Sequence, residues 1–234
     1  RGLAFMNSMI LKHRLYDKHA NVRIMIPRSV VIATDYFDDF IRLNGLKYII
    51  SQEFSDEEIL SEFVSSTVPA RLQQELKAYI QTVRTPLAVR SSSKLEDSHY
   101  QPFAGIYSTY MIPYVDNGDQ MLRLLLKAVK SVYASVYFAT SRAYLSSSQN
   151  LISEEKMAVI IQEVCGTEQD GLFFPTFSGV ARSINYYPIG DEAPADGVCN
   201  IAMGLGKLVV DGGRTLRFSP RYPQKVLQTS TPEL

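Results

Sequence analysis

The sequence has no tryptophan, two cysteines and three histidines among 234 residues, and these shortages argue against several kinds of site. Cys165 and Cys199 lie in apolar stretches without a CxxC spacing, which argues against a disulfide framework or a zinc site. We expect both to be free, buried thiols in a reducing cytoplasm. His13, His19 and His99 form no cluster with metal-ligand spacing, and we expect His13 and His19 to be solvated on a polar helix face.

Net charge is also lacking, because 24 basic side chains balance 24 acidic ones. No global field therefore favours a nucleic acid or an anionic membrane, and we expect neither as a partner. Any anion must be bound by a local arrangement of side chains.

The apolar stretch 121–145 contains four basic residues, so we do not expect it to span a membrane, and no signal peptide is evident. The opening Arg1–Gly2, without Met, is interpreted as part of a longer protein.

The pattern of apolar residues changes near residue 150 and predicts two lobes. Helical and strand patterns alternate before it, with a long helix expected over 117–145, and short strands separated by Gly, Pro and Asp turns follow the polar stretch 146–150. We therefore predict an α+β fold, with a mixed α/β first lobe (1–150) joined by the long helix to a mainly antiparallel second lobe (151–234). The other expected elements are helices over 3–16, 34–43, from 55 and from 69 to 83, and strands over 24–26, 30–32, 87–91, 106–112, 157–165, 178–185, 198–203 and 216–219.

The strongest chemical signal is the segment Leu87–Tyr110, LAVRSSSKLEDSHYQPFAGIYSTY. Its apolar strand places Arg90 beside three consecutive serines, and a small-residue turn at Gly105 follows. An arginine fork beside hydroxyls and backbone N–H groups suits a phosphate or a carboxylate, and glycine lets backbone approach a ligand closely. From these residues alone an alternative stays open, in which Arg90 pairs with Glu96 or Asp97 and the last of the serines starts a helix capping box.

Five stretches, in order along nearly the whole chain, resemble one protein family. VRSSSKLEDS and FAGIYSTY are similar to the VRSS-x-x-x-ED and FAG-x-x-x-T-aromatic signature of the nucleotide-binding domain of phosphoenolpyruvate synthase and pyruvate phosphate dikinase. Rifampicin phosphotransferases and glucan/water dikinases share that domain, which has an ATP-grasp architecture. The other matching stretches are RGLAFMNSMI with IPRSVVIATDYFDDFIRLNGL, FATSRAY, VIIQEVCG, and SGVARS with MGLGKLVVDGG.

The resemblance implies a phosphate site. Arg90 would contact the terminal phosphates of ATP, and Arg142 would reach them from the long helix, so both would serve catalysis. Gly105 and Thr109 would lie in the turn and strand that cover the phosphates with backbone N–H groups, and Ser91 would bind beside Arg90. Without the resemblance, Arg142 is interpreted as a solvated charge on a helix.

The resemblance also implies an adenine-side hinge between the lobes, formed by Gln162, Glu163 and Val164. Backbone groups there would contact the purine edge, and the Gln162 side chain would face the nucleotide. Without the resemblance, Ile160–Cys165 is interpreted as a core strand. A buried Gln–Glu pair in such a strand needs hydrogen-bond partners.

The activity implied by the resemblance is that of an ATP-dependent phosphotransferase. In the parent enzymes, this domain transfers a phosphoryl group from ATP to a histidine on a mobile carrier domain, which then visits a separate acceptor-binding domain. The expected cofactors are therefore ATP and Mg²⁺, and the expected partners are those two domains of the same parent protein. Such chemistry consists mostly of positioning and charge neutralisation, so the domain needs no Ser–His or Cys–His pair. We do not expect the fragment alone to make phosphoenolpyruvate.

Three departures from the family leave a second hypothesis open. The family's GGK turn, whose lysine binds phosphate, is missing before the first helix. Lys207 replaces the glutamate of the family's GLGE, and the magnesium-binding acid of a later strand has no counterpart, so the metal ligands are expected outside this chain. The alternative is a degenerate nucleotide-binding or regulatory module without catalysis. A carboxylate–amine ligase, another ATP-grasp activity, would need an acceptor site that the sequence does not reveal.

Overall fold

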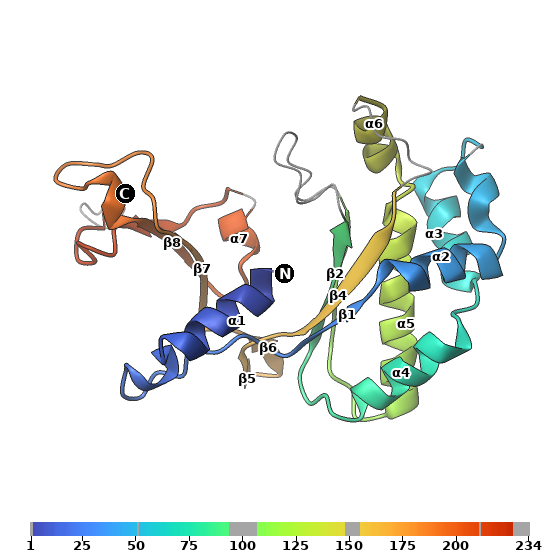
Figure 1. Cartoon of the computed structure of the whole chain (residues 1–234), viewed down its shortest axis with the longest axis horizontal. Coiled ribbons are helices and arrows are strands. Elements are labelled where there is room, and N and C mark those ends of the chain that lie inside the picture. Colours follow the sequence, from blue (N-terminus) through green and yellow to red (C-terminus); the bar gives the residue numbers. More distant parts are fainter. Residues whose placement is uncertain (1, 51, 94–106, 148–154, 211, 227–234) are drawn as a thin grey trace. The chain divides into compact units, whose positions relative to one another are not determined.

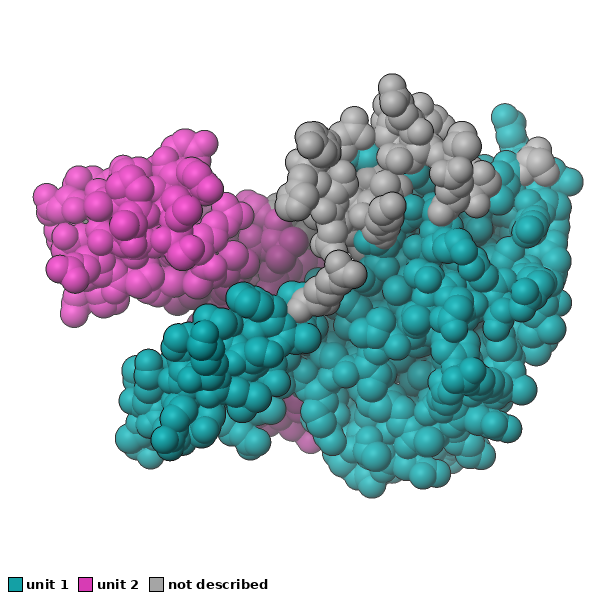
Figure 2. Space-filling view, viewed as in Figure 1, with its two compact units in different colours: residues 1–164 teal, residues 165–234 magenta. Residues whose placement is uncertain are grey.

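The computed structural model describes residues 2–50, 52–93, 107–147, 155–210 and 212–226 (Figure 1). Contacts divide the chain into unit 1, residues 1–164, and unit 2, residues 165–234 (Figure 2). Helices occur together with antiparallel sheets, which confirms the predicted α+β class. Within the described ranges, no helix combines the length and the apolar character that crossing a bilayer requires.

Unit 1 is built on a four-stranded sheet with the strand order β1-β4-β2-β3, and all neighbouring strands are antiparallel. Helices α2 and α5 contact the sheet and cover one of its faces (Figure 1). The elements of unit 1 are α1 (Gly2–Lys12), η1 (Leu15–Asp17), β1 (Ser29–Ile32), α2 (Thr34–Leu43), η2 (Leu46–Ile50), α3 (Asp56–Ser65), α4 (Ala70–Ile80), β2 (Leu87–Ser93), β3 (Thr109–Ile112), α5 (Gly118–Ser135), α6 (Ala139–Ser147) and β4 (Met157–Glu163).

The core of unit 1 lies between the sheet and the helices. Burial alternates along β2 and β4, because successive side chains of a strand point to opposite faces. Leu87 and Val89 of β2 are fully buried, as are Val159 and Ile161 of β4. They join one cluster with helix residues that include Phe40, Phe63, Leu125 and Val129. Burial of this apolar surface stabilises unit 1 and fixes which face of the sheet stays open.

Unit 2 consists of short strands and few buried side chains. Strands β7, β8 and β9 form a sheet in that order, and β5 pairs with β6. The described residues of unit 2 that are buried are Asn185, Gly197, Ala202 and Ser219. Its elements are β5 (Thr167–Gln169), β6 (Leu172–Phe174), β7 (Phe177–Arg182), η4 (Pro194–Asp196), β8 (Val198–Met203), α7 (Lys207–Val210) and β9 (Leu216–Phe218).

The division between the units differs from the boundary expected at residue 150, and β4 is the reason. The expected boundary at residue 150 places this strand in the second lobe. In the structure β4 lies between β1 and β2, with Val159 opposite both Ile32 and Ser91. Hydrogen-bonded ladders on both sides therefore make β4 the inner strand of unit 1, and the chain divides after Val164.

The expected helix over 117–145 is interrupted, because α5 ends at Ser135 and α6 begins at Ala139. The backbone N–H of Ala139 donates to Asp56 Oδ1 at 2.7 Å, and Ser141 Oγ donates to the Ser135 carbonyl at 2.7 Å. These side chains satisfy backbone groups at the break. Helix α5 packs on β2 and β3 within unit 1.

The structure shows the exposure of both cysteines and of two histidines, for which expectations follow from the sequence. Cys165 and Cys199 are free, as predicted. The expectation of burial is wrong, because Cys165 is exposed and Cys199 is half-buried. Cys165 lies two residues beyond the end of β4 and is not part of the buried core. His13 and His19 are exposed, as expected, and His99 lies outside the described residues.

Candidate functional site

The sheet face of unit 1 opposite α2 and α5, called here the open face, combines polar and apolar side chains. Val31 is 63% exposed and Met111 is 51% exposed, so this face is accessible within unit 1. Large exposed apolar side chains beside polar ones are typical of binding surfaces. By strand alternation and register, the open face is formed by Ser29 and Val31 of β1, Ala158, Ile160 and Gln162 of β4, Ala88, Arg90 and Ser92 of β2, and Thr109 and Met111 of β3.

Arg90, Thr109 and Gln162 share one patch of the open face. Arg90 lies directly opposite Thr109 on β3 and opposite Ile160 on β4, while Gln162 lies two residues further along β4. Side chains directly opposite have Cβ atoms about 5 Å apart, and diagonal neighbours are about 7–8 Å apart. Arg90 is exposed, and its guanidinium makes no hydrogen bond or ion pair with another described residue. Its donors are therefore available to an anion.

The half-buried Gln162 makes a side-chain contact across the sheet. Its Nε2 donates to Ser29 Oγ at 3.1 Å, and Ser29 Oγ donates to the Pro27 carbonyl at 3.0 Å. Ser29 and Gln162 are opposite each other in the β1–β4 ladder. Ser29 of β1 therefore supplies the hydrogen-bond partner that the half-buried Gln162 side chain requires.

Glu163 lies on the opposite face of β4 from Gln162. Its Oε1 lies 2.8 Å from an Arg28 guanidinium nitrogen in an ion pair whose angle does not make a hydrogen bond. Arg28 is mostly exposed, whereas the Glu163 side chain is only 13% exposed. Burial raises the pKa of the neighbouring Tyr79 phenol to about 12, and the negative charge of Glu163 adds to this rise. The side chain of Glu163 thus links β4 to the segment before β1.

Two backbone donors of the expected hinge are used within unit 1. The N–H of Glu163 donates to the Arg28 carbonyl at 3.0 Å, and the N–H of Val164 donates to the Pro86 carbonyl at 2.9 Å. Both bonds extend the pairing of β4 with its neighbours at the end of unit 1. A purine at this hinge would therefore be contacted through other groups, such as the Gln162 side chain.

Two other residues expected at the site, Ser91 and Arg142, are not among the sheet residues that form the open face. Ser91 alternates with Arg90 and lies on the helix-covered side of β2, together with Val89 and Ser93. Arg142 belongs to α6, is half-buried, and donates from Nη2 to the Phe54 carbonyl at 2.8 Å.

One expected site residue, Gly105, lies outside the described residues. So do the two acids of the alternative interpretation of Arg90, Glu96 and Asp97.

Sequence reasoning missed Ser29 and Ser92 as residues of the open face. Ser92 is the serine on the same face as Arg90, because β2 continues through Ser93 instead of ending at residue 91. The period-two pattern of a longer strand would have identified it. Ser29 carried no local signal, since its partner Gln162 is 133 residues away.

The groups gathered on the open face suit a phosphate. They include a guanidinium, hydroxyls and an amide, and none of the described residues of this face is acidic. In the described part of the chain, His, Cys, Asp and Glu residues form no group of three that could hold a metal ion. The described residues therefore do not fit a magnesium site.

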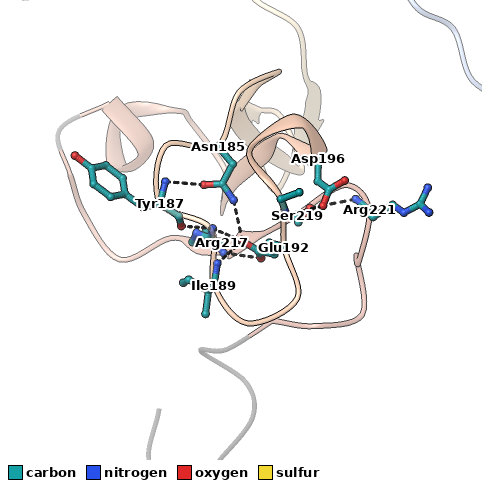
Figure 3. A network of polar contacts seen from close by, with 9 residues as sticks. Asn185, Tyr187, Ile189, Glu192, Asp196, Arg217, Ser219 and Arg221 are labelled. Atoms are coloured by element: carbon teal, nitrogen blue, oxygen red, sulfur yellow. Dashed lines mark hydrogen bonds and ion pairs between the residues drawn. The ribbon is translucent and has the colours of Figure 1, made fainter.

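Unit 2 contains a polar network centred on Glu192 (Figure 3). Arg217 donates to both carboxylate oxygens of Glu192, at 2.9 and 2.7 Å, and Asn185 Nδ2 donates at 2.8 Å. The N–H of Ile189 donates to the same carboxylate at 3.0 Å, and Arg217 also donates to the Tyr187 carbonyl. These bonds, led by those from Arg217, lower the pKa of Glu192 to about 2. The network connects a loop to β9 with its polar groups paired, which indicates a structural role.

A comparison of the sequence with known families gives a match over most of the chain. A family model described as "Pyruvate phosphate dikinase, AMP/ATP-binding domain" matches residues 7–228, nearly the whole chain. The chain belongs to this family. The resemblance found in the sequence motifs is thereby confirmed, and membership of an AMP/ATP-binding domain family implies nucleotide binding.

Several relatives of this pyruvate phosphate dikinase-type domain carry related names. It is 28% identical over 193 residues to an uncharacterized phosphotransferase, YvkC, of Bacillus subtilis. It is 26% identical over 214 residues to a probable phosphoenolpyruvate synthase of Staphylothermus marinus, and 24% identical over 210 residues to a phosphoenolpyruvate synthase of Aeropyrum pernix. Each match covers 81% of this chain but only 20%, 23% and 24% of the respective relative. The chain thus spans less than a quarter of the length of these proteins.

Proposed function

We propose that this domain binds ATP and passes its phosphoryl group to a histidine on a carrier domain outside this chain. The carrier would then deliver the group to an acceptor-binding domain of the same parent protein. The single observation that supports ATP binding best is the exposed Arg90 guanidinium, which has no partner among the described residues and lies beside Thr109 and Gln162. The family and the phosphotransferase and synthase names of the relatives support the reaction class.

The chemistry asked of the open face is binding and orientation. Arg90 would bind phosphate oxygens through its planar fork, and the Thr109 hydroxyl would donate to an adjacent oxygen. Val31, Ile160 and Met111 offer apolar surface for the base. Mg²⁺ would add charge neutralisation from ligands outside the described residues. An ATP-grasp arrangement, with the two units as its lobes, belongs to this proposal and is supported by the order of the motifs.

Calorimetric titration of Mg-ATP into the chain tests the proposal. Arg90→Ala removes the charged donors and should weaken binding about 10- to 100-fold, the range expected for hydrogen bonds to charged groups. Arg123→Ala is the matched control, because Arg123 is an exposed arginine on α5, which covers the other face of the sheet. The control should bind Mg-ATP like the unmodified chain.

Two results would contradict the proposal. Equal affinity of Arg90→Ala and the unmodified chain would remove Arg90 from the site. Absence of ATP binding by the unmodified chain would favour the second candidate, a degenerate nucleotide-binding or regulatory module without catalysis. The exposed Lys207 on α7, in place of the family's glutamate, is the observation that favours this second candidate.

A further inference from the structure

The contact between Ser29 and Gln162 fixes the orientation of an amide on the open face. The Ser29 hydroxyl has one hydrogen, which it donates to the Pro27 carbonyl. Toward Gln162, Ser29 Oγ can therefore only accept a hydrogen bond, so the Gln162 amide must turn its NH₂ group to β1. A reversed amide would bring two oxygens together without a hydrogen between them. The proton of Ser29 thus determines which end of the amide faces β1.

This orientation leaves the Gln162 carbonyl oxygen, Oε1, as an acceptor. Oε1 makes no hydrogen bond with another described residue. The backbone that carries it is held from three sides, by the ladders to β1 and β2 and by the ion pair of Glu163 with Arg28 on the opposite face. The backbone of Gln162 is therefore fixed, and only its side chain can change conformation. The hydrogen bond to Ser29 restricts that side chain further.

We infer that Ser29 is a positioning residue that sets the base preference of the site through Gln162. The inference rests on the proposed function, in which ATP binds on the open face, and it adds that the base lies beside Gln162. An acceptor fixed at Oε1 suits a base with an exocyclic amino donor, such as adenine. It opposes a base with a carbonyl at the same position, because two acceptors would face each other without a proton.

Inosine triphosphate is the appropriate probe, because it has the sugar and phosphates of ATP. It differs at the base edge, where a carbonyl replaces the amino group and N1 carries a hydrogen. The dissociation constants of Mg-ATP and Mg-ITP give a ratio in which contacts to the phosphates cancel. We expect the chain to bind ATP about tenfold more tightly than ITP, the size of one hydrogen bond.

Three serine variants test the role of the hydroxyl. Ser29→Ala frees the amide to reverse, so the preference for ATP over ITP should fall from about tenfold to near one. Ser29→Thr keeps a hydroxyl in a strand and should restore the preference. Ser65→Ala is the matched control, since Ser65 also donates to a backbone carbonyl, that of Glu62, but lies on α3. It should leave the ratio unchanged.

The outcomes separate this inference from the proposed function. An unchanged ATP-to-ITP ratio in Ser29→Ala, with Arg90→Ala weakening both nucleotides, would overturn the role of Ser29 and leave the proposed function standing. Equal affinity of the unmodified chain for ATP and ITP would also overturn the role of Ser29 and leave the proposed function standing. Absence of binding of either nucleotide to the unmodified chain would overturn both. A merely structural defect in Ser29→Ala would weaken both nucleotides alike and leave the ratio unchanged, which also counts against the inference.

Discussion

Arg90 and Ser91 are neighbours in the chain, yet they lie on opposite faces of β2. Arg90 is exposed on the open face, whereas Ser91 lies on the helix-covered side. The family motif contains both residues, but the alternation of a strand separates their side chains. At the scale of single residues, the hydroxyl available beside Arg90 within β2 is that of Ser92, and the one directly across the ladder is that of Thr109.

The carboxylate of Glu192 makes the stability of unit 2 dependent on pH. Its pKa is lowered from 4.5 to about 2 in the folded chain. A lowered folded-state pKa stabilises the fold above the unfolded value, and this contribution disappears as the pH falls through the folded value. We therefore expect the free energy of unfolding of unit 2 to decrease between pH 4.5 and pH 2. A urea titration at several pH values, followed by the NMR signals of β8 and β9, measures it.

Two variants assign this pH dependence. Glu192→Gln keeps the shape but not the charge, and should lower the stability of unit 2 at pH 7 by about 2 kcal/mol while flattening the dependence below pH 4.5. Asp191→Asn is the control, because the pair of Asp191 with Lys225 is exposed. This control should retain most of the dependence. The same slope in Glu192→Gln as in the unmodified chain would contradict the assignment.

Among the elements, α3 shows how local chemistry defines a helix start. Ser55 Oγ accepts from the N–H of Glu58 at 3.2 Å, and Glu58 Oε2 accepts from the N–H of Ser55 at 2.8 Å. This reciprocal capping box confirms the helix start that the sequence predicts at Ser55. The start of α6 is capped differently, because the N–H of its first residue, Ala139, donates to the carboxylate of Asp56, which is 83 residues away in the sequence. No local pattern could reveal that second start.

The capping box gives a prediction at the scale of the element. Ser55→Ala removes the acceptor for the N–H of Glu58 and should lower the free energy of unfolding of unit 1 by about 1 kcal/mol. Ser61→Ala is the control, since Ser61 is exposed within the same helix and alanine favours helix formation. Urea unfolding followed by circular dichroism compares the two variants. Equal loss of stability in both would show that the box contributes nothing measurable.

At the scale of the whole molecule, apolar burial is concentrated in unit 1. Its described core includes strands β2 and β4, helix α5 and a group of packed aromatic rings, in which Phe40 contacts Phe63 and Tyr133. Ala202 is the buried apolar residue that the structure describes in unit 2. Because buried apolar area is the main source of stability, the two units should differ in how readily they open.

Amide hydrogen exchange of the whole chain measures this difference. We expect the amides of β2 and β4 to exchange more slowly than those of β8 by about two orders of magnitude or more, because opening free energies range from near zero to the global value. β8 is the fair comparison, since it is also an inner strand with neighbours on both sides. Equal protection of β4 and β8 would show that unit 2 is as stable as unit 1.

Much of the molecule follows from local sequence, and the exceptions have a common physical origin. The strand that begins at Leu87, the helix capped at Ser55 and the α+β class are predictable, because side-chain periodicity and capping act over a few residues. The position of β4, predicted as a strand but not as part of unit 1, required its partners β1 and β2. The break between α5 and α6 required Asp56.

The sequence by itself determined the family, because the five motifs and their order can be recognised without knowing any tertiary contact. It also identified Arg90, Thr109 and Gln162 as candidate site residues. Only the tertiary structure decided that these three share one face, that Ser91 does not join them, and that Ser29 contacts Gln162. Strand pairing decides such questions. It joins residues as far apart as Ser29 and Gln162, and a contact over 133 residues leaves no pattern in the sequence around either partner.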